Sequence, residues 1–192
     1  MSNGIILSTD DRGCIDRATK MLAGIQGAAS KAVNSAIRRA ATSGEAYAAK
    51  VIRKEYIIKA GDFKTYTHSK RHYHTTGGSQ SVTIEYFGNH IPLIKFDTSI
   101  DSGGRVTARV KRSSARQVLE HAFFSSRIGA REGIFERTTS SREPTKEIMG
   151  PSVPQMMSYN ENVKQAIADK VYDVFDERLD HEILAILNGW RN

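Results

Sequence analysis

The chain has 192 residues, of which 39% are hydrophobic and 26% charged, and its net charge is +7. This composition fits a single globular domain with a hydrophobic core and excludes a chain that is disordered throughout. No apolar run approaches the length of about 18 residues that a membrane span needs, and the single cysteine, Cys14, excludes an intrachain disulfide, so we expect a soluble protein made in the cytoplasm without a secretory signal.

The stretch 15–59 predicts one long amphipathic helix, because apolar residues recur at every third or fourth position. Such a helix would be about 60 Å long, so we expect it to break, bend or protrude. The expected weak points are Gly24, Gly27 and Gly44, since glycine inside a helix costs about 1 kcal/mol relative to alanine. The small residues of this helix would let another element or subunit come close, and we assign to this candidate interface Ala29, Ala36, Ala40 and Tyr47.

Residues 60–80 form a polar segment that contains glycines and has no helical stripe, and we predict a loop or a flexible excursion at an edge. The segment contains His68, His72 and His74, and His90 follows, a spacing at which imidazoles can bind zinc or nickel. No cysteine or carboxylate joins the histidines locally, and the basic residues between them would oppose a cation. A solvated loop, or one ordered by a partner, is therefore the preferred interpretation.

Residues 81–137 predict an antiparallel sheet of about four to five strands. Runs with strand character occur at 81–87, 91–96 and 105–111, and a second hairpin joins 118–124 to 133–137. In the run 105–111, alternate positions hold Arg105, Thr107, Arg109 and Lys111, which predicts a strand with a basic outer face. This face is either solvated or a contact surface for an acidic partner or nucleic acid.

Residues 138–157 predict an extended connector, because Pro144, Pro151 and Pro154 interrupt regular structure. The apolar residues of the connector need cover. Packing on the chain's own sheet is the default interpretation, and docking on a neighbouring subunit is the alternative. Docking would use Ile148, Met149, Pro151, Val153, Pro154 and Met156.

The helical pattern returns over 158–189, where Ser158 and Glu161 have the spacing of a capping box. The order of helix, sheet, connector and helix predicts an α+β domain over 15–192, preceded by a tail of residues 1–14. Both helices are expected to pack on one antiparallel sheet.

The charges are unevenly distributed along the chain. Residues 1–116 carry 19 Lys and Arg against 9 Asp and Glu, whereas residues 160–192 carry 4 against 7. This asymmetry fits a nucleic-acid footprint or association between copies of the chain. The sequence contains no phosphate-binding loop, nucleophile elbow, zinc-protease motif or cysteine pair, so we expect neither an enzyme nor a bound cofactor or metal.

The segment 122–156 resembles the C-terminal half of minor tail protein Z of phages and prophages, a tail-completion family. The resemblance is carried by Ala122-Phe123-Phe124, Gly129, Gly133-Ile134-Phe135-Glu136-Arg137, Pro144 and Glu147-Ile148-Met149-Gly150-Pro151-Ser152-Val153-Pro154-Gln155-Met156. The alanine-rich first helix and the acidic last helix come in the order that this family has, so the resemblance covers roughly residues 15–190. The N-terminal tail and the histidine-rich segment do not match the family.

The resemblance implies a structural virion protein, not an enzyme, at the head-proximal end of a tail, where it finishes the tail and supports head–tail joining. It also implies a ring, commonly sixfold, around the DNA channel. The implied partners are other copies of the chain, the tail tube, the tail terminator and neck or sheath proteins, with no membrane. In such a ring, channel DNA would be contacted through its phosphates by Arg105, Arg109 and Lys111.

Two alternatives of other classes remain open. A sequence-independent nucleic-acid-binding protein would use the basic N-terminal helix and the strand at 105–111, and its binding would depend on salt. A metal-dependent enzyme would be built on the four histidines at positions 68, 72, 74 and 90.

Overall fold

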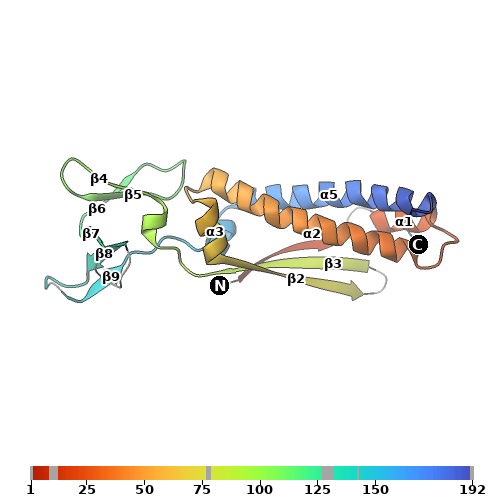
Figure 1. Cartoon of the computed structure of the whole chain (residues 1–192), viewed down its shortest axis with the longest axis horizontal. Helices are drawn as coiled ribbons and strands as arrows, with labels where there is room; N and C mark the ends of the chain where they lie inside the picture. The colour runs from red at the N-terminus through yellow and green to blue at the C-terminus, as the bar shows by residue number, and fades with distance from the viewer. Residues whose placement is uncertain (1, 9–12, 77–78, 127–131, 142, 191–192) are drawn as a thin grey trace. The chain divides into compact units, whose positions relative to one another are not determined.

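The computed structural model describes residues 2–8, 13–76, 79–126, 132–141 and 143–190, and these residues have the predicted α+β fold (Figure 1). The chain divides into two compact units that are interleaved in sequence. Unit 1 comprises 49–68 and 87–159, and unit 2 comprises 2–48, 69–86 and 160–192. No helix in the described part of the chain is both long and apolar enough to cross a membrane.

Two helices, α1 (Cys14–Met21) and α2 (Ala28–Glu55), replace the single helix predicted over 15–59. The break falls at two of the predicted glycines, because Gly24 and Gly27 have φ angles of 98° and 72°, which L-residues with a side chain rarely adopt. The prediction of a weak point at Gly44 is wrong. A Cβ at Gly44 would collide with Cγ2 of Val171 on helix α5 (Glu161–Leu187), so this glycine instead lets the two helices pack closely.

Unit 2 combines these helices with a sheet in the order β1-β3-β2, and α2 and α5 lie along that sheet (Figure 1). The strands are β1 (Ser2–Ser8), β2 (Thr67–Thr76) and β3 (Ser79–Gly88). Strand β1 lies within the segment predicted as a tail. The core of unit 2 consists of apolar side chains with at most 1% exposure, among them Ala36, Ile37 and Ala40 of α2, Ile84 of β3, and Ile167, Phe175 and Leu179 of α5.

The prediction of a histidine-rich loop at 60–80 is wrong. Residues 60–66 form helix α3 (Ala60–Tyr66), which is anchored by the buried Phe63, and residues 67–76 form strand β2. Strand β2 lies at the edge of its sheet, and residues 68–75 are exposed. An exposed edge strand buries no face, so it lacks the alternation of apolar and polar residues by which strands are usually detected.

Unit 1 contains two small antiparallel sheets, so the single sheet predicted over 81–137 is wrong. One sheet has the order β4-β5-β6 and the other β7-β8-β9. The strands are β4 (Asp97–Ile100), β5 (Val106–Arg109), β6 (Gln117–Leu119), β7 (Ala122–Ser125), β8 (Gly133–Arg137) and β9 (Thr145–Glu147). The predicted turn at 101–104 is confirmed, since Ile100 pairs with Val106 across it. The predicted second hairpin is confirmed for β7 and β8, but the strand predicted over 118–124 is wrong in its first part, because residues 117–119 form β6 and pair with β5.

The strand predicted at 91–96 is absent from the structure, and Pro92 explains why. Pro92 has no N–H to donate to a ladder and makes only an isolated bridge to Met149. A single 3-10 turn, η2 (Leu93–Lys95), follows it. Helix α2 ends at Glu55, before the predicted residue 59, and the next residue, Tyr56, makes an isolated bridge with Lys111.

The connector is more regular than predicted, because it contains β9 and helix α4 (Val153–Ser158). Ser152 caps α4 in a capping box with Gln155, and Pro154 lies in the first turn, where its missing N–H removes no helical hydrogen bond. The capping box predicted at Ser158 is wrong, since Asn160 caps α5.

Candidate interaction surfaces

The segment that carries the family resemblance forms a framework within unit 1. The backbone N–H of Ile148 donates to the carbonyl of Ile134 over 2.8 Å, and the N–H of Gly150 donates to the carbonyl of Ile91 over 2.7 Å. A Cβ at Gly150 would collide with the ring of Phe96, so the backbone approaches this ring as only glycine allows. The connector is therefore fixed to β8 and to the segment before η2. Gly129, which also belongs to the resemblance, lies outside the described residues.

The connector residues predicted as an interface are mostly buried by the chain itself. Val153 and Met156 are 0% exposed, and Pro154 is buried in α4. Ile148 and Pro151 are half-buried, whereas the side chain of Met149 is 44% exposed. Packing within the chain, the default interpretation, accounts for the buried residues, which offer no surface to another subunit.

The interface residues predicted on the first helix also divide into buried and partly exposed ones. Ala36 and Ala40 are 0% exposed because α5 and the sheet of unit 2 cover this face of α2. Ala29 and Tyr47 are half-buried. The alanine stripe therefore serves the packing of unit 2, and only its margins reach the surface.

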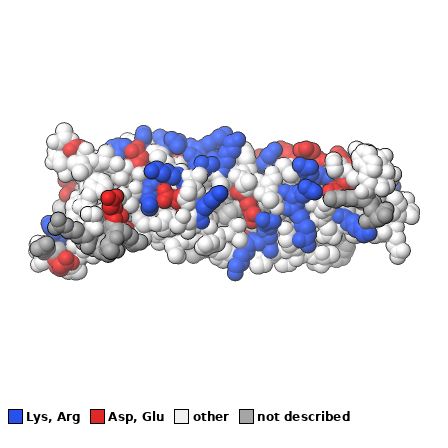
Figure 2. Space-filling view, in the orientation of Figure 1, with Lys and Arg blue, Asp and Glu red and all other residues white. Residues whose placement is uncertain are grey.

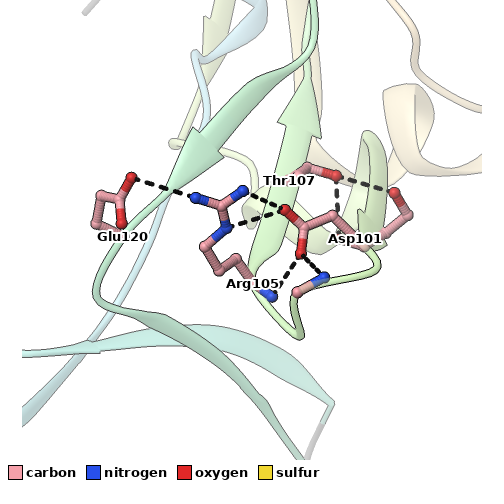
Figure 3. A network of polar contacts seen from close by, with 6 residues as sticks. Asp101, Arg105, Thr107 and Glu120 are labelled. Carbon is pink, nitrogen blue, oxygen red and sulfur yellow. Dashed lines mark hydrogen bonds and ion pairs between the residues drawn. The ribbon is translucent and has the colours of Figure 1, made fainter.

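Arg105, the first basic residue of the predicted strand face, has its positive charge neutralised by neighbouring carboxylates. The Arg105 guanidinium contacts the Asp101 carboxylate through Nε and Nη2, both at 3.0 Å, and its Nη1 lies 3.9 Å from Glu120 (Figure 3). Asp101 also accepts hydrogen bonds from the backbone N–H groups of Gly103 and Arg105. These bonds, the Arg105 N–H first among them, lower the pKa of the Asp101 carboxyl below its ordinary value. The network thus closes the β4–β5 turn.

The next two basic residues of this face also have partners. Arg109 and Arg116 both contact the Asp97 carboxylate, with shortest N···O distances of 3.0 and 2.6 Å. Their hydrogen bonds, that of Arg116 first, lower the pKa of the Asp97 carboxyl. The ammonium of Lys111 lies 5.6 Å from the centroid of the Tyr56 ring. Between the arginines, Thr107 is buried, so the predicted face is not a continuous basic surface.

A hollow of about 480 Å³ in unit 1 brings together residues from both predicted surfaces. Arg109 and Lys111 of the basic face and Pro151 of the connector line it. Its other walls are largely apolar and include Tyr56, Leu93, Leu119 and Tyr159. The Tyr159 side chain is 74% exposed. Apolar walls with a basic rim suit the apolar and acidic side chains of a protein partner.

The four histidines of the metal-dependent alternative do not form a cluster. His72 lies 3.3 Å from the Glu85 carboxylate, and Nδ1 of His90 lies 3.2 Å from the carbonyl of Gly150. Within the described ranges, no group of three or more His, Cys, Asp or Glu side chains is arranged to hold a metal ion.

A groove in unit 2 was not predicted. Its α2 wall holds Arg38, Arg39, Thr42, Ser43 and Ala46, and its α5 wall holds Lys170, Val174, Glu177 and Arg178. We call it the α2–α5 groove, and its volume is about 560 Å³. The sequence signal that could have revealed it is the i, i+4, i+8 spacing of Lys170, Val174 and Arg178 along α5, but its use requires knowing that α2 lies alongside.

No protein-family model matches the chain, and neither a curated protein nor a solved structure matches it.

Proposed function

We propose that this protein is a structural subunit of a phage or phage-like tail that forms a ring at the head-proximal end, finishes the tail and supports head–tail joining. The observation that carries the proposal is that the residues of the resemblance lie together in one framework. The hairpin β7–β8, strand β9, Gly150 and the capped helix α4 are joined by backbone hydrogen bonds and close packing.

The hollow of unit 1 is the proposed contact surface for a neighbouring tail protein. It adjoins the framework at Pro151, and it offers the exposed Tyr159 ring and two basic side chains. Tyrosine and arginine are enriched at protein interfaces because they combine apolar area with hydrogen-bond donors. The buried Val153 and Met156 contribute by holding the framework, and not by touching the partner.

The proposed contact with channel DNA can be tested at one residue. Arg105 and Arg109 are engaged by carboxylates, so their replacement would disturb the hairpin as well as any DNA contact. Lys111 makes no ion pair with any described residue. Lys111→Gln should reduce DNA delivery by particles of normal appearance, and unchanged delivery would count against the DNA contact.

The experiment that tests the function is disruption of the coding sequence in the genome that carries it, followed by electron microscopy of the particles. The expected result is separate heads and tails, with joined particles restored by the wild-type gene. Gold particles directed at a tagged copy should label the head-proximal end of the tail. Joined, infectious particles from the disrupted strain, or particles without label, would refute the proposal.

A matched pair of complementing variants tests the contact surface. Tyr159→Ser alters the hollow, whereas Trp190→Ser removes an aromatic side chain of similar exposure, 75%, from unit 2. Head–tail joining should fail with Tyr159→Ser and persist with Trp190→Ser, while both proteins keep wild-type circular dichroism. Equal joining by the two variants would exclude the hollow as the contact.

The alternative of a free nucleic-acid-binding protein is not favoured by a specific observation. The strand cations Arg105 and Arg109 are paired with carboxylates. Arg53 and Lys54 lie in the last turn of α2, where positive charge stabilises the helix end through its dipole.

A further inference from the structure

The α2–α5 groove gathers positive charge on the surface of unit 2. Four cationic side chains line it, Arg38 and Arg39 from α2 and Lys170 and Arg178 from α5, and Glu177 is the one acidic side chain among the lining residues. Ser43 also lines the groove with a hydroxyl group, whereas the hydroxyl of the neighbouring Thr42 already donates to the carbonyl of Arg38 over 3.0 Å. The groove is therefore built to receive an anionic group with several acceptor oxygens.

The cations of the groove are poorly compensated by the chain itself. The Arg38 guanidinium stacks over the Tyr73 ring at 4.6 Å, and Arg39 reaches Glu182 only at 3.8 Å. Among the described residues, neither Lys170 nor Arg178 makes an ion pair. Like charges that line one groove repel one another, and an anionic partner would relieve that repulsion.

The same helix carries a complementary surface on another face. Asp169, Asp173, Asp176 and Asp180 follow one another at helical intervals, and we call them the α5 acidic stripe. At about 1.5 Å of rise per residue the stripe is about 16 Å long, and at about 3.6 residues per turn it lies opposite the buried face of α5. Three of its members are exposed, of which Asp180 already pairs with Arg17 over 2.8 Å, and Asp176 is half-buried. Figure 2 shows acidic side chains gathered over α5 and basic ones over α2.

We propose that the α2–α5 groove of one subunit binds the α5 acidic stripe of a second copy of this chain. The described residues of unit 2 carry ten Lys and Arg and ten Asp and Glu, so this unit is neutral but its charges are segregated. Nucleic acid is attracted by excess positive charge, whereas a neutral unit with segregated charges is complementary to its own copies.

Groove and stripe occupy different faces of α5, so a subunit cannot fill its own groove. In a head-to-tail contact each bound copy presents a free groove or stripe to the next, whereas a two-fold pair that exchanged both would stop at a dimer. Head-to-tail contacts close into rings or continue as filaments. The association of two copies is inferred from the charges of unit 2 alone. Its interpretation as the subunit contact of a tail ring rests on the proposed function.

Charge reversal tests the contact by analytical ultracentrifugation over a concentration series. Arg178→Glu alters the groove and leaves the stripe intact, and Asp173→Lys does the opposite. Each variant alone should associate at least about tenfold more weakly than wild type, and a mixture of the two should form one-to-one pairs, because each retains the half that the other lacks. Lys31→Glu and Glu161→Lys make the same charge changes outside groove and stripe, and should associate like wild type.

Salt dependence provides the second readout. Association should be strong at about 0.1 M salt, where the Debye length is about 10 Å, and weaker at about 1 M, where it is about 3 Å. A wild-type protein that stays monomeric at low salt, or reversed variants that associate normally, would overturn the inference. It would also be overturned if a fluorescent DNA oligonucleotide bound to wild type but not to Arg178→Glu while self-association was unchanged, since phosphate would then be the occupant.

The outcomes separate this inference from the proposed function. A chain that associates through the groove but never labels a tail would refute the function alone. Tail-bound protein whose assembly ignores both charge reversals would refute the groove contact alone.

Discussion

The close approach of α2 and α5 at Gly44 predicts that Gly44→Ala destabilises the protein, although alanine is the better helix former. The added Cβ would overlap Cγ2 of Val171, which is 1% exposed and, as a β-branched residue, has little freedom to rotate away. Overpacking a filled core costs about 1 to 3 kcal/mol, whereas replacing a helical glycine by alanine gains about 1 kcal/mol. We expect a net loss of about 1 kcal/mol in the free energy of unfolding, or about 2 to 4 °C in Tm.

Two comparisons make this prediction specific. In α3, a Cβ at Gly61 would meet no atom within 4 Å, so Gly61→Ala should stabilise the protein by up to about 1 kcal/mol. Val171→Ala removes the colliding methyl group, so the double variant Gly44→Ala/Val171→Ala should lose less than the sum of the two single losses. Urea and thermal unfolding followed by circular dichroism measure these differences. Stabilisation by Gly44→Ala equal to that by Gly61→Ala would refute the argument from close approach.

Other buried or networked groups predict further outcomes. Tyr56 and Tyr86 are both 2% exposed, but the Tyr56 hydroxyl donates to the carbonyl of Met156 over 3.3 Å, whereas the Tyr86 hydroxyl has no partner among the described residues. In urea unfolding, Tyr56→Phe should therefore lose about 1 kcal/mol and Tyr86→Phe should lose none, and equal losses would contradict this assignment. Ser152→Ala removes the capping box of α4 and should lower the unfolding free energy by about 1 kcal/mol in the same assay; no loss would show that the cap is dispensable. The pKa of Asp101 is lowered in the folded state, so its contribution to stability is present above the ordinary value of about 3.9 and is lost as pH falls through the lowered value. Asp101→Asn should flatten the decline of Tm below about pH 4, and an unchanged decline would contradict the bonding of this carboxylate.

Features set by local chemistry could be predicted from the sequence. The turn at 101–104 follows from the sequence Asp101-Ser102-Gly103-Gly104, the pairing of β7 with β8 follows from two nearby β-forming runs, and α5 follows from apolar residues that recur at helical intervals. The break in the first helix was expected at glycines, and two of the three glycines do break it. In each of these cases the deciding interactions lie close together along the chain.

Features set by tertiary neighbours could not be predicted. From its sequence neighbours alone, Gly44 looks like a glycine that weakens a helix. Only the position of Val171 shows that it instead allows two helices to pack closely. Strand β2 buries no face and therefore has no apolar alternation. The division of the strands into separate sheets depends on which strand edges meet, which the composition of each strand does not encode.

The candidate surfaces also depend on tertiary neighbours that the sequence does not reveal. Apolar residues such as Val153 and Met156 were identified as needing cover, but an apolar pattern does not say whether the cover comes from the same chain. The basic face at Arg109 required the strand register, which places Asp97 opposite it. The α2–α5 groove required the pairing of two helices whose cations lie more than a hundred positions apart in sequence.

The interleaving of the two units has a consequence for synthesis on the ribosome. All segments of unit 1 precede residue 160, whereas unit 2 needs α5, which emerges later. Until then the apolar face of α2, with Ile37 and the neighbouring alanines, lacks part of its cover. The nascent chain therefore passes through a stage in which unit 1 can fold while unit 2 is incomplete. At this stage the exposed apolar face of α2 can bind chaperones or associate with neighbouring nascent chains. Substitutions that delay the docking of α5 should reduce soluble yield more than they reduce the stability of the finished protein.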